Sequence, residues 1–141
     1  MKRTTQFFLL AMTMLSVAVF VAAKPHSDDA STGKQIVVRG LVRDIACPVQ
    51  NHQSTSRHFN RKCAEACAKA GSPLAILTDD GTMYLTISDT MPDATQNSKL
   101  MPFVGKYVEA TGTGYERNGL HTIAIKDIHE DKSVALRDDL Q

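Results

Sequence analysis

The sequence predicts a mainly β protein with one short inserted helix, arranged as a small five-stranded barrel. Two stretches, residues 35–44 and 106–115, carry apolar residues at alternate positions, which is typical of strands with one buried face. Asn118-Gly119 favours a tight hairpin turn between the second stretch and residues 120–128. Two glycines inside the second stretch indicate a bulge or sharp coiling.

The helix is predicted between the first and second strands. The segment from Arg61 to Ala70 is rich in alanine and favours a helix. Asn60 precedes it as an N-cap, because its side-chain oxygen can accept an unpaired backbone N–H. Gly71 supplies the left-handed position at the C-terminal end, and Pro73 follows. A helix this short needs packing to persist.

The remaining segments complete the predicted order of elements. Residues 46–59 are polar and turn-forming, so we expect a loop there. Residues 74–77 and 83–87 flank a turn at 78–81 and predict a hairpin. Residues 89–102 are mixed, with a weak helical segment. The hairpin over residues 106–128 then supplies the last two strands.

These strands resemble an OB-fold. The stretch Gly-Lys-x-Val-x-Ala-Thr-Gly at 105–112 and the hairpin that continues to residue 128 are similar to the last two strands of that barrel. The usual helix of an OB-fold follows the third strand, whereas the helix expected here follows the first. A resemblance at the level of fold implies no particular function.

Composition limits the class of protein. The chain has 141 residues, 43% hydrophobic and 22% charged, with a formal net charge of +1. These values predict one globular domain and exclude collagen-like, low-complexity and wholly disordered chains. A charge so close to zero gives no reason to expect a nucleic-acid partner.

The N-terminus predicts export. A basic start at Met1–Arg3 is followed by an uncharged run over 4–23, which ends in small residues. This pattern predicts a signal peptide over 1–23, cleaved after Ala23, and a periplasmic or secreted protein. The alternative is an uncleaved membrane anchor, since about 20 apolar residues can span a bilayer. We expect a flexible tether at 24–33, the OB-like domain at 34–130 and a frayed, charged tail at 131–141.

Soft metal ligands gather in one short region. Cys63 and Cys67 are four residues apart and share one face of the predicted helix. His58 lies just before the helix, and Cys47 lies where the first strand ends. Together these four side chains form a candidate site for zinc or copper(I), and His52 is a secondary candidate ligand.

Two other interpretations of the cysteines stay open. In the first, a disulfide from Cys47 to Cys63 or Cys67 closes a loop and leaves one thiol unpaired. The disulfide then only stabilises the loop, and the domain binds a peptide or glycan. Alternatively, Cys63 and Cys67 form a thiol–disulfide redox pair. Arg61, Lys62 and the start of the helix would then lower the pKa of the Cys63 thiol.

The motifs in this region resemble those of small secreted bacterial proteins of uncharacterised function. The matching residues are Gly40-x-Val42-x-Asp44-x2-Cys47 and His58-x4-Cys63-Ala64-x2-Cys67-x3-Gly71-x-Pro73, within a resemblance that covers about residues 38–128. It implies a single OB-like module with a Cys/His cluster in an extracytoplasmic setting. It supplies no reaction.

The sequence therefore predicts an exported metal-binding domain with a structural or metal-handling role. Its partner would be an unknown protein or a metal-delivery protein. A closed site with four ligands leaves no position for a reacting water, so we do not expect a hydrolase, and the redox interpretation of the cysteines stays open.

Overall fold

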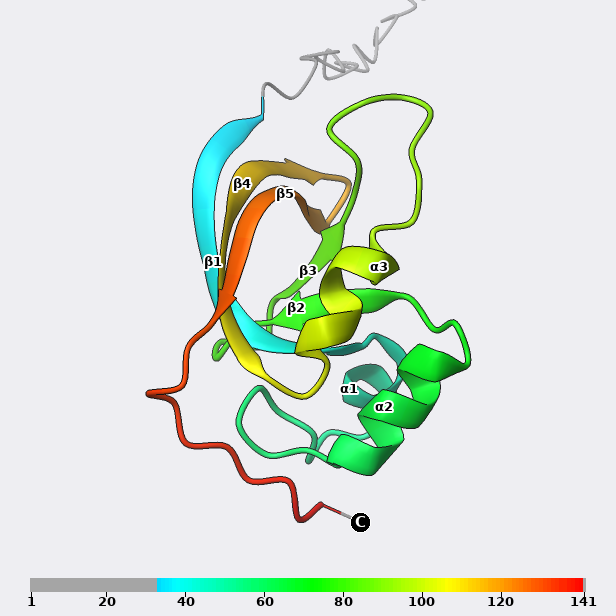
Figure 1. Cartoon of the computed structure of the whole chain (residues 1–141), viewed down its shortest axis with the longest axis vertical. Helices are drawn as coiled ribbons and strands as arrows, with labels where there is room; N and C mark the ends of the chain where they lie inside the picture. The colour runs from blue at the N-terminus through cyan, green and yellow to red at the C-terminus, as the bar shows by residue number, and fades with distance from the viewer. Residues whose placement is uncertain (1–32, 141) are drawn as a thin grey trace, which may run out of the picture.

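The computed structural model describes residues 33–140 as a closed five-stranded barrel with a few short helices (Figure 1). The strands lie in the order β1-β2-β3-β5-β4, and β4 closes on β1. All neighbours pair antiparallel except β3 and β5, which are parallel. The fold class predicted from the sequence is confirmed. The strands are β1 (Lys34–Asp44), β2 (Leu74–Leu77), β3 (Met83–Thr86), β4 (Tyr107–Arg117) and β5 (Leu120–Glu130).

Small residues let the strands of the barrel coil tightly. A Cβ at Gly112 in β4 would overlap the carbonyl oxygen of Ala124 in β5. The register between these two strands shifts at Thr111/Gly112, which is the bulge that the strand glycines predicted. Gly40 in β1 is placed in the same way against the carbonyl oxygen of Leu77. The enclosed core is aliphatic, and its fully buried members include Leu41, Val42, Ile76, Val108 and Ile123.

Over the part of the chain that the structure describes, four short helices lie outside the sheet: α1 (Ala46–Gln50), α2 (Arg61–Lys69), α3 (Asn97–Leu100) and the 3-10 helix η1 (Met101–Phe103). Helix α2 lies between β1 and β2, as predicted, and Asn60 caps it. Helix α1 falls in the segment predicted as a loop. It forms because Asp44 accepts the backbone N–H of Cys47 at 2.9 Å, and because Pro48 is tolerated in a first helical turn.

The C-terminal segment is not the frayed tail that its charge suggested. The backbone N–H of Phe59 donates to the carbonyl of Arg137 at 2.9 Å, and that of Leu140 donates to Phe59 at 3.3 Å. Phe59 is completely buried, and Leu140 is 9% exposed. The segment therefore packs along the stretch that leads into α2, because leucines among its charged residues supply apolar contacts.

The predicted signal peptide at 1–23 and nearly all of the predicted tether at 24–33 lie outside the described residues. Over residues 33–140, no helix has the length and apolar character needed to cross a membrane.

Candidate metal centre

Three sulfur atoms meet where α1 and α2 lie together at the end of β1. The Sγ atoms of Cys47, Cys63 and Cys67 all lie within 4.8 Å of one another. The Sγ atoms of Cys47 and Cys63 are 3.2 Å apart. All three side chains are half-buried, so the cluster is open to solvent on one side.

Local structure brings these cysteines together. The Asn60 side chain accepts the backbone N–H of Cys63 at 2.8 Å, which fixes the first turn of α2. Ala64 and Ala68 form the buried face of α2, and their small side chains let the helix lie close to the barrel. Cys63 and Cys67 are then on adjacent turns, one above the other. Cys47 is presented to them by α1.

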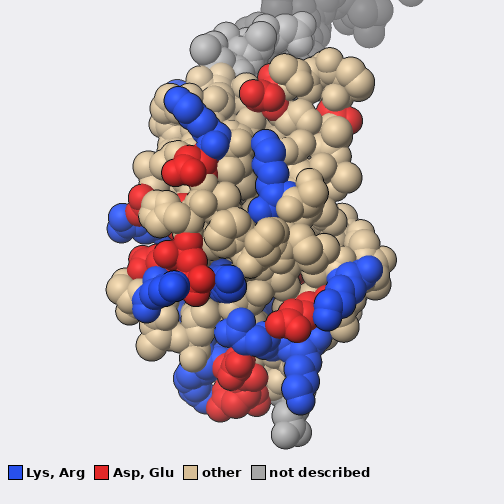
Figure 2. All heavy atoms as spheres, viewed as in Figure 1, with Lys and Arg blue, Asp and Glu red and all other residues tan. Residues whose placement is uncertain are grey.

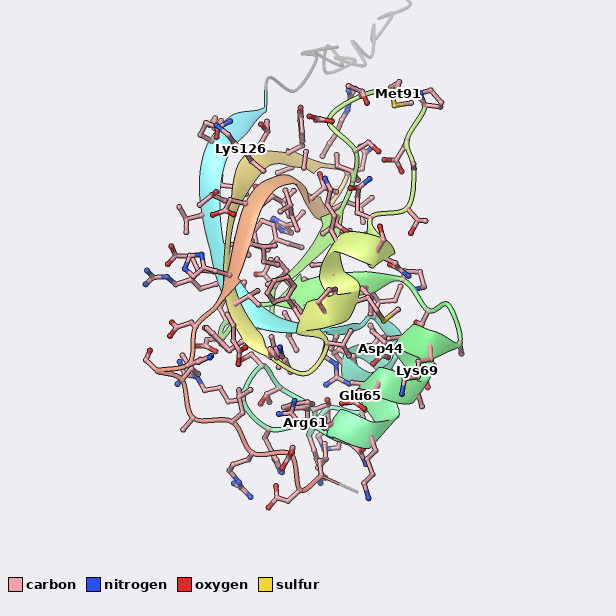
Figure 3. All side chains as sticks on the ribbon, viewed as in Figure 1. Asp44, Arg61, Glu65, Lys69, Met91 and Lys126 are labelled. Atoms are coloured by element: carbon pink, nitrogen blue, oxygen red, sulfur yellow. The ribbon has the colours of Figure 1, made fainter. Side chains whose placement is uncertain are left out.

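A buried ion pair lies next to the cluster. Asp44 and Arg43, at the end of β1, are 0% and 1% exposed. Arg43 Nη2 lies 3.5 Å from Asp44 Oδ1, and Arg43 Nη1 donates to Ser54 Oγ. Figure 3 labels Asp44 beside the short helices. Its Oδ2 accepts the backbone N–H of Cys47, so this carboxylate positions the first cysteine. Among the described residues, Arg43 Nε has no hydrogen-bond partner.

The surroundings of the thiols favour their protonated form. Burial raises the pKa of the Cys47 thiol to about 11, with further contributions from the contact with Cys63 and the charge of Asp44. Burial and then Asp44 also raise the pKa of Cys67. These two thiols therefore lack the lowered pKa of a reactive thiolate, and a bound cation would have to displace their protons.

The two candidate histidines, His58 and His52, lie outside this group. His58 Nε2 lies 2.8 Å from Asp139 Oδ1, so the C-terminal segment holds the imidazole. His52 is exposed and borders a cavity of about 310 Å³ together with Pro48 and Asp79. Of the four ligands predicted from the sequence, the structure brings together the three cysteines.

No disulfide links the cysteines. All three are free, and the distance of 3.2 Å between the Sγ atoms of Cys47 and Cys63 is well beyond the roughly 2.05 Å of a disulfide bond. The disulfide that the sequence left open is therefore not formed in this structure.

Sequence reasoning missed the side chains that support the site. Asp44 was part of a recognised motif, yet its role as the acceptor for Cys47 depends on where β1 ends in space. Asp139 gave no signal at all, because it is 81 residues from its partner His58 and lies in a charged segment. The alternation of charged residues with Leu136 and Leu140 was the available hint that this segment packs.

Comparison of the chain with protein-family models, with curated proteins and with solved structures found no match. Of the resemblance to small secreted bacterial proteins, the structure shows the cysteine cluster. Any function must therefore be inferred from the site itself.

Proposed function

We propose that this protein binds a thiophilic metal ion, copper(I) in preference to zinc, through Cys47, Cys63 and Cys67. The observation that carries the proposal is the approach of three sulfur atoms to within 4.8 Å of one another. Thiolates are soft ligands, and soft ligands select copper(I), zinc and iron–sulfur clusters. Three convergent cysteines from two helices are a more specific arrangement than any single cysteine.

The number of ligands favours copper(I). Structural zinc is almost always held by four protein ligands in a closed tetrahedron. Among the described residues, the compact group offers three sulfurs and no histidine or carboxylate. Three soft donors suffice for copper(I), whereas zinc would need a water or an outside ligand in the fourth position.

The position of the cluster favours metal handling over a purely structural role. The cysteines are half-buried at the edge of the molecule, and the barrel has its own aliphatic core. An ion held here is accessible to another protein. The basic and apolar N-terminal segment supports the further proposal that this handling takes place outside the cytoplasm.

The test is an anaerobic copper(I) titration of the reduced protein against a colorimetric copper(I) chelator. We expect one equivalent to bind, and we expect the Cys47→Ser, Cys63→Ser and Cys67→Ser variants each to lose affinity. His58→Ala is the matched control, because its imidazole binds Asp139 and lies outside the sulfur group. A wild-type affinity in all three serine variants would contradict the proposal. Parallel titration with zinc tests the stated preference.

A second candidate function is thiol–disulfide exchange, favoured by the 3.2 Å contact between Cys47 and Cys63. In this reaction the two thiols reduce one disulfide of an oxidised dithiol reagent, so that a Cys47–Cys63 disulfide and two reagent thiols form. Intact-mass measurement after such treatment distinguishes the two functions. A rapid decrease in the mass of the wild type by two hydrogen atoms, with Cys67 remaining free, would favour exchange.

A further inference from the structure

We infer that the exposed ridge of α2 beside the cysteines is a docking surface for an acidic protein that delivers the metal ion. This inference rests on the proposed function, because the partner is defined as the donor of the ion. The ridge consists of Lys62, Ala66 and Lys69, which are all exposed. Positions three and four apart on a helix are neighbours, so these residues form one row.

The ridge borders the sulfur cluster directly. Ala66 is three residues after Cys63, so a small side chain lies next to this ligand. A partner can therefore approach the sulfurs closely on this side. Helix α1, which carries Cys47, also presents Val49, which is 70% exposed.

The charge of this surface identifies the chemistry of the partner. Neither Lys62 nor Lys69 takes part in an ion pair among the described residues. Figure 2 shows basic side chains along α2, with an acidic group between them. That acidic residue is Glu65, which is half-buried. Complementary charge speeds the encounter of two proteins and selects the partner, so an acidic rim is expected on the donor.

Transfer itself needs no redox step. A donor that holds copper(I) with two thiolates passes it to the three thiols of the protein. The two donor thiolates take up two of the three protons, and the third proton goes to water. The cluster then carries three thiolates and one monovalent cation, a net charge of −2 that offsets the two lysines. Loading therefore weakens the attraction for an acidic partner and favours its release.

The transfer experiment uses a defined donor, a synthetic Cys-x-x-Cys peptide flanked by glutamates and loaded with copper(I). The matched donor carries glutamines instead. At about 0.01 M salt, where the Debye length is roughly 30 Å, we expect the glutamate peptide to transfer its ion about tenfold faster. At about 1 M salt, where that length is roughly 3 Å, the two rates should converge.

The decisive variant is Lys62→Glu/Lys69→Glu, which should lose the preference for the glutamate peptide at low salt. Its equilibrium copper(I) affinity is compared with that of the wild type at about 1 M salt, where the new charges are screened and the two affinities should be equal. Lys126→Glu is the matched control, because Lys126 is exposed on β5 and lies on the opposite side of the molecule from α2 (Figure 3). Equal rates for both peptides at low salt would overturn the docking inference alone. Equal effects of Lys126→Glu and the double variant would overturn it as well. If the wild type does not bind copper(I) in the equilibrium titration, the proposed function itself fails. That titration uses no donor peptide, so its outcome is independent of the docking inference.

A third peptide tests release, a glutamate peptide with both cysteines replaced by serine. It should bind the metal-free protein more tightly than the copper(I)-loaded protein at low salt. Equal affinity for the two forms would refute the proposed weakening on loading.

Discussion

The buried ion pair beneath the cluster makes the sharpest prediction for stability. In Asp44→Asn the side chain keeps an oxygen that can accept the Cys47 N–H, but the negative charge is lost. Arg43 then remains buried with Ser54 as its remaining side-chain partner. Removing one partner of a buried pair costs about 3–5 kcal/mol. Because Arg43 Nη2 and Asp44 Oδ1 are 3.5 Å apart, at the weak end of hydrogen bonding, we expect a loss of about 3 kcal/mol.

The double variant Arg43→Met/Asp44→Asn separates charge from packing. Arg43→Met alone leaves the Asp44 carboxylate buried and should also cost about 3 kcal/mol. With both charges removed no uncompensated charge remains, so the double variant should lose only about 1–2 kcal/mol. The losses of unfolding free energy in the two single variants therefore do not add up in the double variant, as expected for residues in direct contact.

The assay is urea unfolding of the metal-free, reduced protein with a chelator present. Arg39→Met is the matched control on the same strand, because its ion pair with Glu109 is exposed and should contribute less than about 1 kcal/mol. If the two single losses simply add in the double variant, the buried pair is not coupled and the reasoning fails. A loss below about 1 kcal/mol in Asp44→Asn would refute it too.

Three further results are expected. Leu140→Ala should cost about 2 kcal/mol in urea unfolding, because this side chain is buried against the stretch before α2, while the exposed Leu120→Ala should stay within about 0.5 kcal/mol. Arg57 lowers the pKa of Asp79 to about 2. The ionised carboxylate therefore stabilises the fold above about pH 4, and this stabilisation is lost as the pH falls toward 2. Asp79→Asn should flatten that part of an acid-unfolding curve. The thiolate absorbance of Cys47 in the metal-free protein should develop only near pH 11. The copper(I) affinity of the protein should rise with pH below that value, because binding displaces the thiol proton. Absorbance that develops near pH 8 would contradict the buried environment described for this thiol.

The sequence predicted the barrel well because its signals are local. The alternation in β1 and β4, the turn at Asn118-Gly119 and the cap at Asn60 each depend on neighbouring residues. Asn118 and Gly119 both have the positive φ that such a turn requires. Local patterns of this kind indicate where strands, turns and helices begin and end, and packing against the core then stabilises them.

The site was only partly predictable because it depends on contacts between distant segments. The four-residue spacing of Cys63 and Cys67 predicted one shared face, and the structure brings Cys47 to them. The separation of His58 from this group could not be predicted from spacing, since it is set by the contact of its Nε2 with Asp139. Helix α1 was missed for the same reason, because the acceptor that starts it, Asp44, belongs to the preceding strand.

The cluster and the barrel core are joined at one helix, and this limits what a bound metal ion can stabilise. Ala64 and Ala68 belong to the aliphatic core, while Cys63 and Cys67 on the same helix face the cluster. A metal ion bound to the cysteines would therefore hold α1 against α2 and resist local opening there. The barrel, closed by β1 and β4, has an aliphatic core of its own, so on the proposed function we expect it to stay folded when the ion leaves. A domain whose metal site is separate from its core can release the ion without unfolding. A protein that transfers metal ions needs this property, whereas a fold that depends on zinc unfolds when the zinc leaves.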